Sequence, residues 1–467
     1  MGNYSLKIIE GNVAIENPFP SFRSSKYKTY YLPGKFKGTD VSVPITDDDL
    51  TKGLLFLGSA GQGKTNTMLA LASQILENLS EDDLVVFFDL KGDYRNTFFE
   101  SSDFVLKATD DRYVWNVFDE MIPFLGNEYM LEMRIKELCQ YLYKGRESKE
   151  PYFTNAAREV TECIFKYFLY SASESGDYSN LNNKSFKNFV KGYGYNYDDT
   201  YEQIRDLLMT YDEFKSALSY IPPREENDKS AYAVISEISS MVNDVFSAAF
   251  GVSDFNGGEY ISASKFAHGD GSQVIYLAYN PAISKSQAYA FRYFVDNIIA
   301  NRCDCFYIDE DILNGTPKKR VQSKKIGKTY IFLDEFAQLP KLEYLTLALG
   351  QLRSLGVCII GGLQEIEQIK SVYKEHEANT ILSGFQSIIS FNCDDESIKY
   401  VQKKTGSTKV QDKFRQAGGS LSYSPPYERK SILDRDVLSL VQGEAFVKIV
   451  GYDPFKFKFS ENRIEGG

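Results

Sequence analysis

Residues 54–68, LLFLGSAGQGKTNTM, decide the fold of this chain. A short apolar run leads into Gly58, and the glycine, lysine and threonine that follow have the spacing G-x-x-x-x-G-K-T. Apolar residues then recur at helical spacing through residue 79, so the order is strand, loop, helix. Glycines let successive backbone N–H groups turn inward around phosphates, and the start of the helix adds a positive end. The stretch therefore predicts a loop that binds a nucleotide.

Each part of this loop has an expected role. Lys64 is expected to reach the β- and γ-phosphates, and the hydroxyl of Thr65 is expected to bind Mg²⁺. The alternative is a glycine turn without a ligand, which the strand and helix on either side disfavour. The residues expected to contact ATP are Gly58, Ser59, Ala60, Gly61, Gln62, Gly63, Lys64, Thr65 and Asn66.

Composition limits the class of protein. The chain has 467 residues, 43% of them apolar, so it can bury a sizeable core. No apolar run reaches the roughly 18 residues that a membrane-spanning helix needs, so we expect a soluble, cytoplasmic protein with no intrinsic membrane span. Six cysteines without CxxC spacing favour a reducing compartment. A net charge of -11 argues against a surface that coats nucleic acid, but not against a local basic channel.

Short apolar runs alternate with helical patterns on both sides of a long helical region. Such alternation predicts an α/β fold with a mainly parallel sheet. Between residues 121 and 255 the strand pattern is absent, which predicts an all-α domain inserted into the α/β domain. The α/β domain is then expected at 46–120 and 256–467, after a lead-in segment at 1–45. The predicted strands are the runs at 84–90, 273–278, 329–335, 357–364, 387–391 and 444–450.

The run TYIFLDEF, residues 329–336, supplies the second half of the candidate site. It is a buried strand that delivers Asp334 and Glu335 to its carboxyl end, where ligands bind in open α/β sheets. Asp334 suits the Mg²⁺ shell, and Glu335 suits the role of general base toward a water molecule. By itself, an apolar run followed by two acids is more often only a strand end. Its position after the glycine loop favours a site that hydrolyses the nucleotide.

Two further residues have candidate roles in hydrolysis. Gln364 ends the next strand and is expected to sense the γ-phosphate. Arg353 precedes that strand, and two interpretations stay open for it. One is a buried salt bridge, and the other is an arginine finger that reaches the nucleotide of a neighbouring subunit, which requires a ring.

The chain resembles the type IV secretion coupling proteins, the TraG/TraD-like branch of the HerA/FtsK class of P-loop ring ATPases. Arg353 and Gln364 follow Asp334 by 19 and 30 positions, as in that family. The resemblance covers about residues 40–450, although Leu90 and Asp93 depart from the family's aspartate-proline-lysine-glycine-glutamate run. The segments that carry it are GSAGQGKT, FFDLKGDY, YVWNVFD, EPYFTNAAREV, LDEFAQLPKLEYL, LRSLGVCIIGGLQEIEQI, ANTILSGFQSIISF and ERKSILDRDVLSLVQGEAFV.

The resemblance implies a RecA-like P-loop domain with an inserted all-α domain, and a homo-oligomer, a hexamer, that hydrolyses ATP with Mg²⁺. It also implies translocation of DNA, single-stranded by expectation, toward a type IV secretion channel, with relaxase or channel proteins as partners. Binding to those partners would bring the protein to the inner face of the cell membrane. Lys403 and Lys404 are candidate DNA contacts, with a solvated helix face as the alternative.

Two other functions compete with the conjugative motor. One is a soluble HerA/FtsK-like DNA translocase that serves DNA processing, packaging or defence. The other is an adaptor for protein substrates, in which the nucleotide only controls assembly. Loss of hydrolysis at Glu335 separates the motors from the adaptor, because only a motor depends on it.

Overall fold

The computed structural model describes residues 5–10, 27–144, 151–191, 197–251, 258–268, 273–280, 282, 287–304, 327–339, 341–415 and 420–461. The chain forms two compact units. We call residues 1–101, 270–274 and 309–467 the sheet unit, and residues 102–269 and 275–308 the helical unit. The insertion predicted at 121–255 falls within the helical unit, and its boundaries stay a prediction.

The sheet unit is built on a mixed sheet with a parallel centre, which confirms the predicted α/β fold. Strands β12, β4, β11, β10 and β5 are parallel neighbours, and β16, β17, β2 and β3 extend the sheet in antiparallel pairs. The central strands are buried along their whole length, as apolar runs between two helical layers should be. In sheet order the strands are β3 (Thr39–Thr46), β2 (Thr29–Phe36), β17 (Phe455–Phe459), β16 (Glu444–Lys448), β12 (Ser387–Ser390), β4 (Leu54–Leu57), β11 (Val357–Leu363), β10 (Thr329–Leu333) and β5 (Leu84–Phe88).

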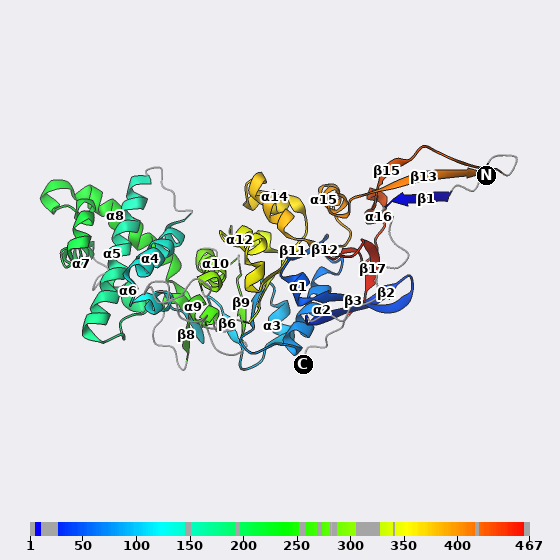
Figure 1. The fold of residues 1–467 in the computed structure, drawn as a ribbon. Helices are drawn as coiled ribbons and strands as arrows, with labels where there is room; N and C mark the ends of the chain where they lie inside the picture. The colour runs from blue at the N-terminus through cyan, green and yellow to red at the C-terminus, as the bar shows by residue number, and fades with distance from the viewer. Residues whose placement is uncertain are drawn as a thin grey trace, which may run out of the picture. The chain divides into compact units, whose positions relative to one another are not determined.

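Helices cover both faces of this sheet. In Figure 1 the blue helices α2 and α3 lie on one face, and the yellow and orange helices α12, α14 and α15 lie on the other. The helical elements of the sheet unit are α1 (Asp47–Leu50), α2 (Lys64–Glu77), α3 (Asp93–Phe98), η6 (Phe336–Gln338), α12 (Leu345–Gly350), η7 (Leu352–Leu355), α13 (Ile366–Val372), α14 (Glu375–Gly384), α15 (Asp395–Thr405) and α16 (Asp434–Leu438).

The leucine-rich residues 342–355, which precede β11, form two short helical pieces. Its apolar stripe is buried, with Leu345 and Leu349 at 0% and 3% exposure. However, α12 ends at Gly350, and a 3₁₀ turn, η7, follows it. Glycine weakens a helix, and Gly356 adopts φ +76°, which lets the chain reverse directly into β11.

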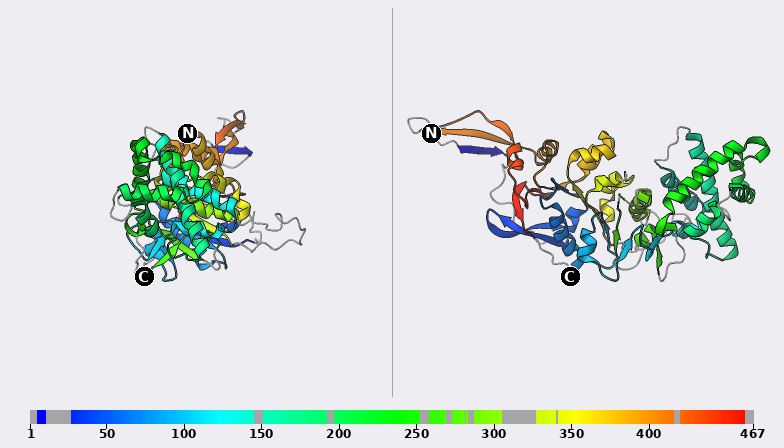
Figure 2. Two further views of the ribbon diagram at one scale, coloured as in Figure 1. Left: turned by 90° about the vertical axis from the view of Figure 1, so that its left-hand side faces the viewer. Right: turned by 180° about the vertical axis from the view of Figure 1, so that it is seen from behind.

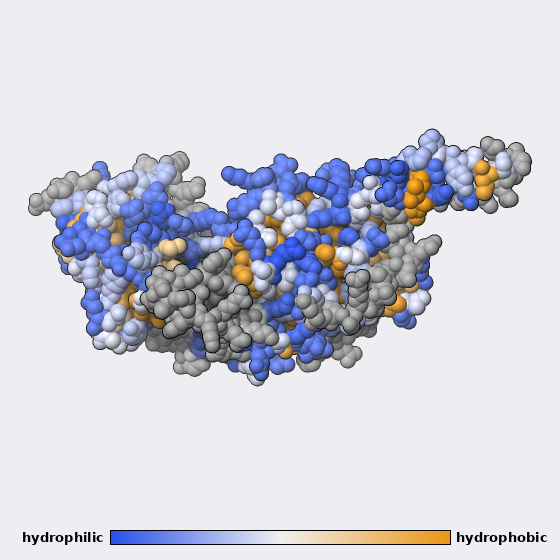
Figure 3. All heavy atoms as spheres, viewed as in Figure 1, coloured by the Kyte–Doolittle hydropathy of each residue, from blue (hydrophilic) through white to orange (hydrophobic). Residues whose placement is uncertain are grey.

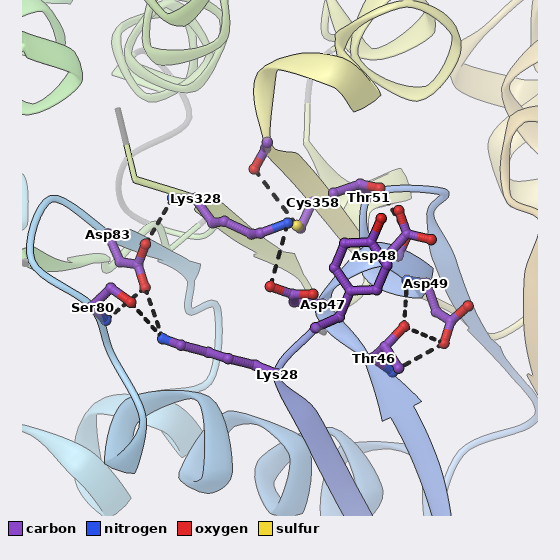
Figure 4. A network of polar contacts seen from close by, with 12 residues as sticks. Lys28, Thr46, Asp47, Asp48, Asp49, Thr51, Ser80, Asp83, Lys328 and Cys358 are labelled. Carbon is purple, nitrogen blue, oxygen red and sulfur yellow. Dashed lines mark hydrogen bonds and ion pairs between the residues drawn. The ribbon is translucent and has the colours of Figure 1, made fainter. Parts of the chain in front are cut away.

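A polar network fixes the amino ends of the central strands (Figure 4). The backbone N–H of Lys328, next to β10, donates to Asp83 Oδ1 at 2.7 Å, and Asp83 itself precedes β5. The Lys328 ammonium lies 3.5 Å from Asp47 Oδ2, and Lys28 donates to Ser80 Oγ at 2.7 Å. These contacts tie the amino ends of β10 and β5 to the residues beside β2 and β3, at the antiparallel end of the sheet.

A second, antiparallel sheet forms a ribbon from distant parts of the chain. Strand β1 (Ser5–Glu10) pairs with β13 (Ser407–Arg415), which also pairs with β14 (Leu421–Tyr423) and β15 (Tyr427–Lys430). Figure 2 shows the blue strand β1 beside these orange strands. Figure 3 shows apolar side chains on this ribbon beside hydrophilic ones, and Ile8 and Leu421 are 44% and 52% exposed.

The helical unit packs around a buried carboxylate. Glu120 accepts hydrogen bonds from the Trp115 indole at 3.0 Å, from the backbone of Ala263 at 2.7 Å and from the Asn297 amide at 2.7 Å. Burial raises the pKa of Glu120 to about 7. The elements of this unit are β6 (Phe104–Leu106), β7 (Tyr113–Trp115), η1 (Val117–Glu120), η2 (Ile122–Phe124), α4 (Glu128–Tyr143), α5 (Pro151–Ser175), α6 (Asn183–Lys191), α7 (Tyr197–Leu208), η3 (Asp212–Tyr220), α8 (Arg224–Val245), η4 (Ala248–Gly251), β8 (Glu259–Ile261), α9 (Ala263–His268) and α10 (Ala288–Asp304), with β9 (Gln273–Leu277) beginning in the sheet unit and pairing with β6.

Within the described part of the chain, no helix is both long enough and apolar enough to cross a bilayer.

Candidate nucleotide-hydrolysis site

The glycine loop connects β4 directly to α2, as the sequence predicts. Gly63 is the N-cap of α2 and has φ +112°, a conformation that favours glycine. A side chain at Gly58 would place its Cβ 2.7 Å from Phe391 Cβ, so this position also needs glycine. The loop thus has the tight backbone that a phosphate-binding turn requires.

Backbone N–H groups of the loop are available to a ligand. Gly58 and Ser59 donate theirs to Leu363 O and Asn392 O, at 3.2 and 2.8 Å. Among the described residues, the N–H groups of residues 60–65 have no such acceptor. Donors that converge at the start of a helix fit the oxygens of a nucleotide phosphate.

Lys64 lies across this loop. Its buried ammonium donates to the carbonyl of Gly58 and to that of Ser59, the latter at 3.2 Å. Burial lowers the pKa of Lys64, and the nearby carboxylates of Asp334 and Glu335 oppose this effect. Lys64 therefore lies where the sequence predicts a phosphate-binding cation.

Asp334 and Thr65 meet beside the loop. Thr65 Oγ1 donates to Asp334 Oδ2 at 3.2 Å, while Asp334 Oδ1 is buried without a hydrogen-bond partner among the described residues. Burial, reinforced by the charge of Glu335, raises the pKa of Asp334 to about 6. A hydroxyl and a carboxylate with a free oxygen are the ligands that Mg²⁺ prefers in nucleotide sites, so these two residues fit the ion. Other Mg²⁺ ligands would be waters and phosphates, since the described residues contain no cluster of three metal-binding side chains.

Glu335 is fixed by donors from three directions. Its Oε1 accepts from Gln364 and from Lys91, each at 2.7 Å, and its Oε2 accepts from Gln338 at 2.5 Å. Burial raises the pKa of Glu335, but the hydrogen bonds from Lys91 and Gln364 outweigh burial and hold the pKa below its ordinary value. The backbone of Glu335 has φ +57°, which is strained for a residue other than glycine. The carboxylate is thus ionised and held in one position.

Three neighbouring strands supply this arrangement. Gln364 directly follows β11, Glu335 is the second residue after β10, and Lys91 is the third residue after β5. These three strands are neighbours in the sheet, in the order β11, β10, β5. The carboxyl ends of parallel strands meet at one edge, which is where α/β sheets bind ligands. A cavity of about 10 Å³, roughly the room that one water molecule needs, lies beside Glu335 and is lined also by Asp89 and Lys91.

Lys91 and Gln338 are contacts of Glu335 that sequence reasoning did not single out. Lys91 lies in the FFDLKGDY segment, which was noted only for its resemblance to a family motif. A signal was nevertheless present, because Lys91 follows the strand next to β10 at the same edge of the sheet. Gln338 has no such signal, since its position depends on the short turn η6.

We expect the Lys91→Met variant to hydrolyse ATP about tenfold more slowly with an almost unchanged KM, because Glu335 loses a contact that positions it. Lys91→Arg should retain the rate, since it keeps the ion pair. Steady-state ATPase assays measure both constants. Lys399→Met is the control, because Lys399 is similarly exposed and paired, with Glu396. A wild-type rate for Lys91→Met would contradict the positioning role.

Arg353 does not lie with the other candidates. It belongs to η7, before β11, whereas Gln364 follows the other end of that strand. Seven strand residues separate these edges by roughly 20 Å. Arg353 is half-buried, and its side chain has no ion pair or hydrogen bond among the described residues. It cannot reach the nucleotide site of its own subunit, and the salt-bridge alternative finds no partner in the described part of the chain.

The remaining candidates have structural contacts instead. Asn66 donates its side-chain amide to Ser460 O at 3.0 Å. Lys404 donates to the carbonyls of Ser383 and Phe385, at 3.1 and 2.5 Å, and burial lowers its pKa to about 8. Lys403 is exposed on α15. Lys404 thus holds the end of α14 and is a poor candidate for a nucleic-acid contact.

Comparison with known proteins shows which family the chain matches. The model of the type IV secretion-system coupling protein DNA-binding domain matches residues 39–195 and 314–451. No curated protein sequence matches the chain. Solved structures with similar folds include an unbound bacterial conjugative coupling protein, TrwBdeltaN70, with 16% identity, a TM-score of 0.63 and coverage of 95% of this chain and 90% of that one.

Two further structures extend the similarity. TrwB in complex with the ATP analogue ADPNP has 17% identity and a TM-score of 0.61, over 90% of this chain and 88% of that one. VirB4 of Thermoanaerobacter pseudethanolicus has 12% identity and a TM-score of 0.51, over 92% and 96%. At these identities the likeness concerns the fold.

Proposed function

The chain belongs to the family of type IV secretion-system coupling proteins, and we propose that it is a ring-forming, Mg²⁺-dependent ATPase that moves DNA toward a secretion channel. The observation that carries the proposal is the fixed carboxylate of Glu335, held by Gln364 and Lys91 next to the Thr65–Asp334 pair. A binding loop alone would suffice for a nucleotide-controlled adaptor. A positioned base beside it is what hydrolysis requires.

The residues of the site divide the reaction among them. The loop N–H groups and Lys64 bind the phosphates, and Glu335 accepts a proton from the attacking water. Gln364 orients Glu335 and is the residue that would sense the presence or loss of the γ-phosphate. Thr65 and Asp334 would hold Mg²⁺, which supplies positive charge to the phosphate oxygens. TrwB has been solved with ADPNP and with ADP and Mg²⁺, which supports the same ligands for this chain.

The position of Arg353 supports the proposal of a ring. Since this residue lies at the far edge of its own sheet, the function that suits it is an arginine finger toward the nucleotide of the next subunit. A hexamer is the assembly that the family resemblance implies. The polymer proposed for the ring is DNA, in line with the DNA-binding domain that the family model describes. Relaxase and channel proteins are the proposed partners.

The test of the ring is complementation between two inactive variants. We expect Arg353→Ala to lower hydrolysis about a thousandfold without weakening nucleotide binding. When mixed with Lys64→Ala protein it should regain part of the activity, because some interfaces then combine an intact Lys64 with an intact Arg353. The measurement is ATPase rate against protein concentration, with and without single- and double-stranded DNA.

The control in this experiment is a chain that carries both substitutions. By itself or mixed with either single variant, it offers no complete interface, because one of the two side chains is then missing from every subunit. Absence of any recovery in the mixture of single variants, at concentrations where the wild type is fully active, would contradict a shared site. A wild-type ATPase that ignores every form of DNA would contradict DNA translocation.

A further inference from the structure

A groove of about 610 Å³ lies on the exposed face of the antiparallel end of the sheet. Its floor is formed by β2, β17 and β16. Its wall is formed by Arg429 on β15, Asp436 on α16 and Ser439 just after α16. It contains none of the residues assigned to nucleotide hydrolysis. The lining residues are Lys35, Phe36, Lys37, Gly38, Arg429, Asp436, Ser439, Glu444, Phe446, Lys456, Phe457 and Lys458.

The lining is cationic, although the chain as a whole carries a net charge of -11. It has five lysine and arginine side chains against two carboxylates. Lys456 forms an ion pair with Glu444 at 2.7 Å. Lys37, Arg429 and Lys458 have no carboxylate within 4 Å among the described residues. The groove therefore has positive charge that its own acids do not neutralise.

Strand register brings two of these cations together. Lys458 on β17 lies directly opposite Lys35 on β2. Like charges at directly opposed positions destabilise an antiparallel pair. Glu444 lies opposite Lys458 on its other side but pairs with Lys456, and Lys35 is only 3.7 Å from the highly exposed Asp40. An anionic ligand in the groove would offset this repulsion.

The spacing of the lysines favours a single nucleic-acid strand as that anion. Lysines two residues apart on a strand, such as Lys456 and Lys458, are spaced about 7 Å apart, a spacing that suits successive phosphates of an extended chain. Phe36 is not one of these contacts, because its ring lies on the other face of β2 from Lys35 and packs edge-on against the buried Phe455, with 6.3 Å between the ring centres.

The groove is connected to the nucleotide loop by short contacts. Gly443, which precedes Glu444, donates its N–H to Gln62 O at 3.0 Å. Phe459, which follows Lys458, donates to Gly443 O at 2.8 Å, and the next residue, Ser460, accepts from Asn66. A ligand that moves the start of β16 and the end of β17 therefore moves atoms that are hydrogen-bonded to Gln62 in the loop and to Asn66 just after it.

We propose that this groove binds the phosphate backbone of single-stranded DNA and transmits binding to the nucleotide loop through Gly443 and Ser460. The proposal rests on the function proposed above, since it assigns a contact site to the polymer of that motor. Lys37, Arg429 and Lys458 contact the phosphates.

The test compares DNA binding by the wild type and by the full-length variant Lys37→Gln/Arg429→Gln/Lys458→Gln. The probe is fluorescein-labelled oligothymidine, and anisotropy is measured at several salt concentrations. We expect affinity to fall about tenfold and the slope of log affinity against log salt to become about two units shallower. ATPase activity without DNA should stay unchanged, whereas its stimulation by DNA should be lost.

The control variant is Lys341→Gln/Lys370→Gln/Lys399→Gln, which removes the same number of charges from lysines outside the groove that pair with acids. It should bind and respond like the wild type. Thermal unfolding checks that both triple variants fold, and the groove variant should be no less stable, because it loses a like-charge pair.

Four results would overturn the proposal. Equal DNA affinity of the two triple variants contradicts DNA binding in the groove but leaves the proposed function untouched. Weaker binding with full stimulation at saturating DNA contradicts the link to the nucleotide loop. Retained DNA binding with lost binding to phosphatidylglycerol vesicles assigns the groove to lipid headgroups instead. A wild-type chain that binds no DNA contradicts both the groove and the proposed function.

Discussion

The Glu335→Gln variant is expected to bind ATP with wild-type affinity and to hydrolyse it at least about a hundredfold more slowly. Glutamine keeps the size of the side chain but cannot accept the proton of the attacking water. It also removes the negative charge that Lys91 contacts at 2.7 Å. The nucleotide-binding contacts do not depend on this carboxylate, because the loop follows β4 and the hydrogen bond from Thr65 is accepted by Asp334, not by Glu335.

Single-turnover hydrolysis and titration with a fluorescent ATP analogue separate the two effects. Glu367→Gln is a suitable control, since Glu367 is an exposed acid on α13 that pairs with Lys370. Hydrolysis by Glu335→Gln close to the wild-type rate would remove Glu335 from the reaction. If DNA transport continued without hydrolysis, the motor would be ruled out in favour of an adaptor.

Lys64→Ala is expected to weaken nucleotide binding about a hundredfold and to abolish measurable hydrolysis. Lys64 is 6% exposed, and its ammonium is held over the loop by the Gly58 and Ser59 carbonyls, so it is already positioned for a phosphate. A charge-assisted bond in such a buried place contributes several times more than one at the surface. The same fluorescent analogue measures the affinity.

The control for Lys64→Ala is Lys52→Ala. Lys52 lies on the same unit and pairs with Asp48 at 2.6 Å, away from the loop. Its loss should leave nucleotide affinity unchanged. Nucleotide affinity of Lys64→Ala within about threefold of the wild type would contradict the assignment of the loop.

The sequence predicted the parallel centre of the sheet well, because its evidence is local. Apolar runs such as 329–333 are short, continuous and followed by polar residues, and this pattern is typical of a buried strand. The glycine loop is equally local, since Gly63 and Lys64 follow one strand and begin one helix. Asp334, Glu335 and Gln364 were predicted to lie near the loop because parallel strands share an edge.

What the sequence did not predict depends on contacts between distant residues. The pairing of β1 with β13, and of β2 with β17, can be predicted only if it is known which strand edges lie side by side. No short sequence pattern contains that information. Lys91 was missed because a lysine after a strand is common, and only its distance to Glu335 distinguishes it. Arg353 was predicted as a candidate, but its distance from Gln364 becomes known only from the structure, in which the extended strand β11 separates the two residues.

The pairing of β2 with β17 also bears on how the chain is made. These strands come from nearly opposite ends of the printed sequence, and β17 lies between β2 and the rest of the sheet. During synthesis on the ribosome, the hairpin of β2 and β3 emerges long before β17 and can join the sheet only after β17 has been translated. Until β16 has been translated, β12 presents an unpaired, apolar strand edge to other chains. Translation of β16 and β17 is therefore the step that pairs this edge of the sheet and ends its exposure to aggregation.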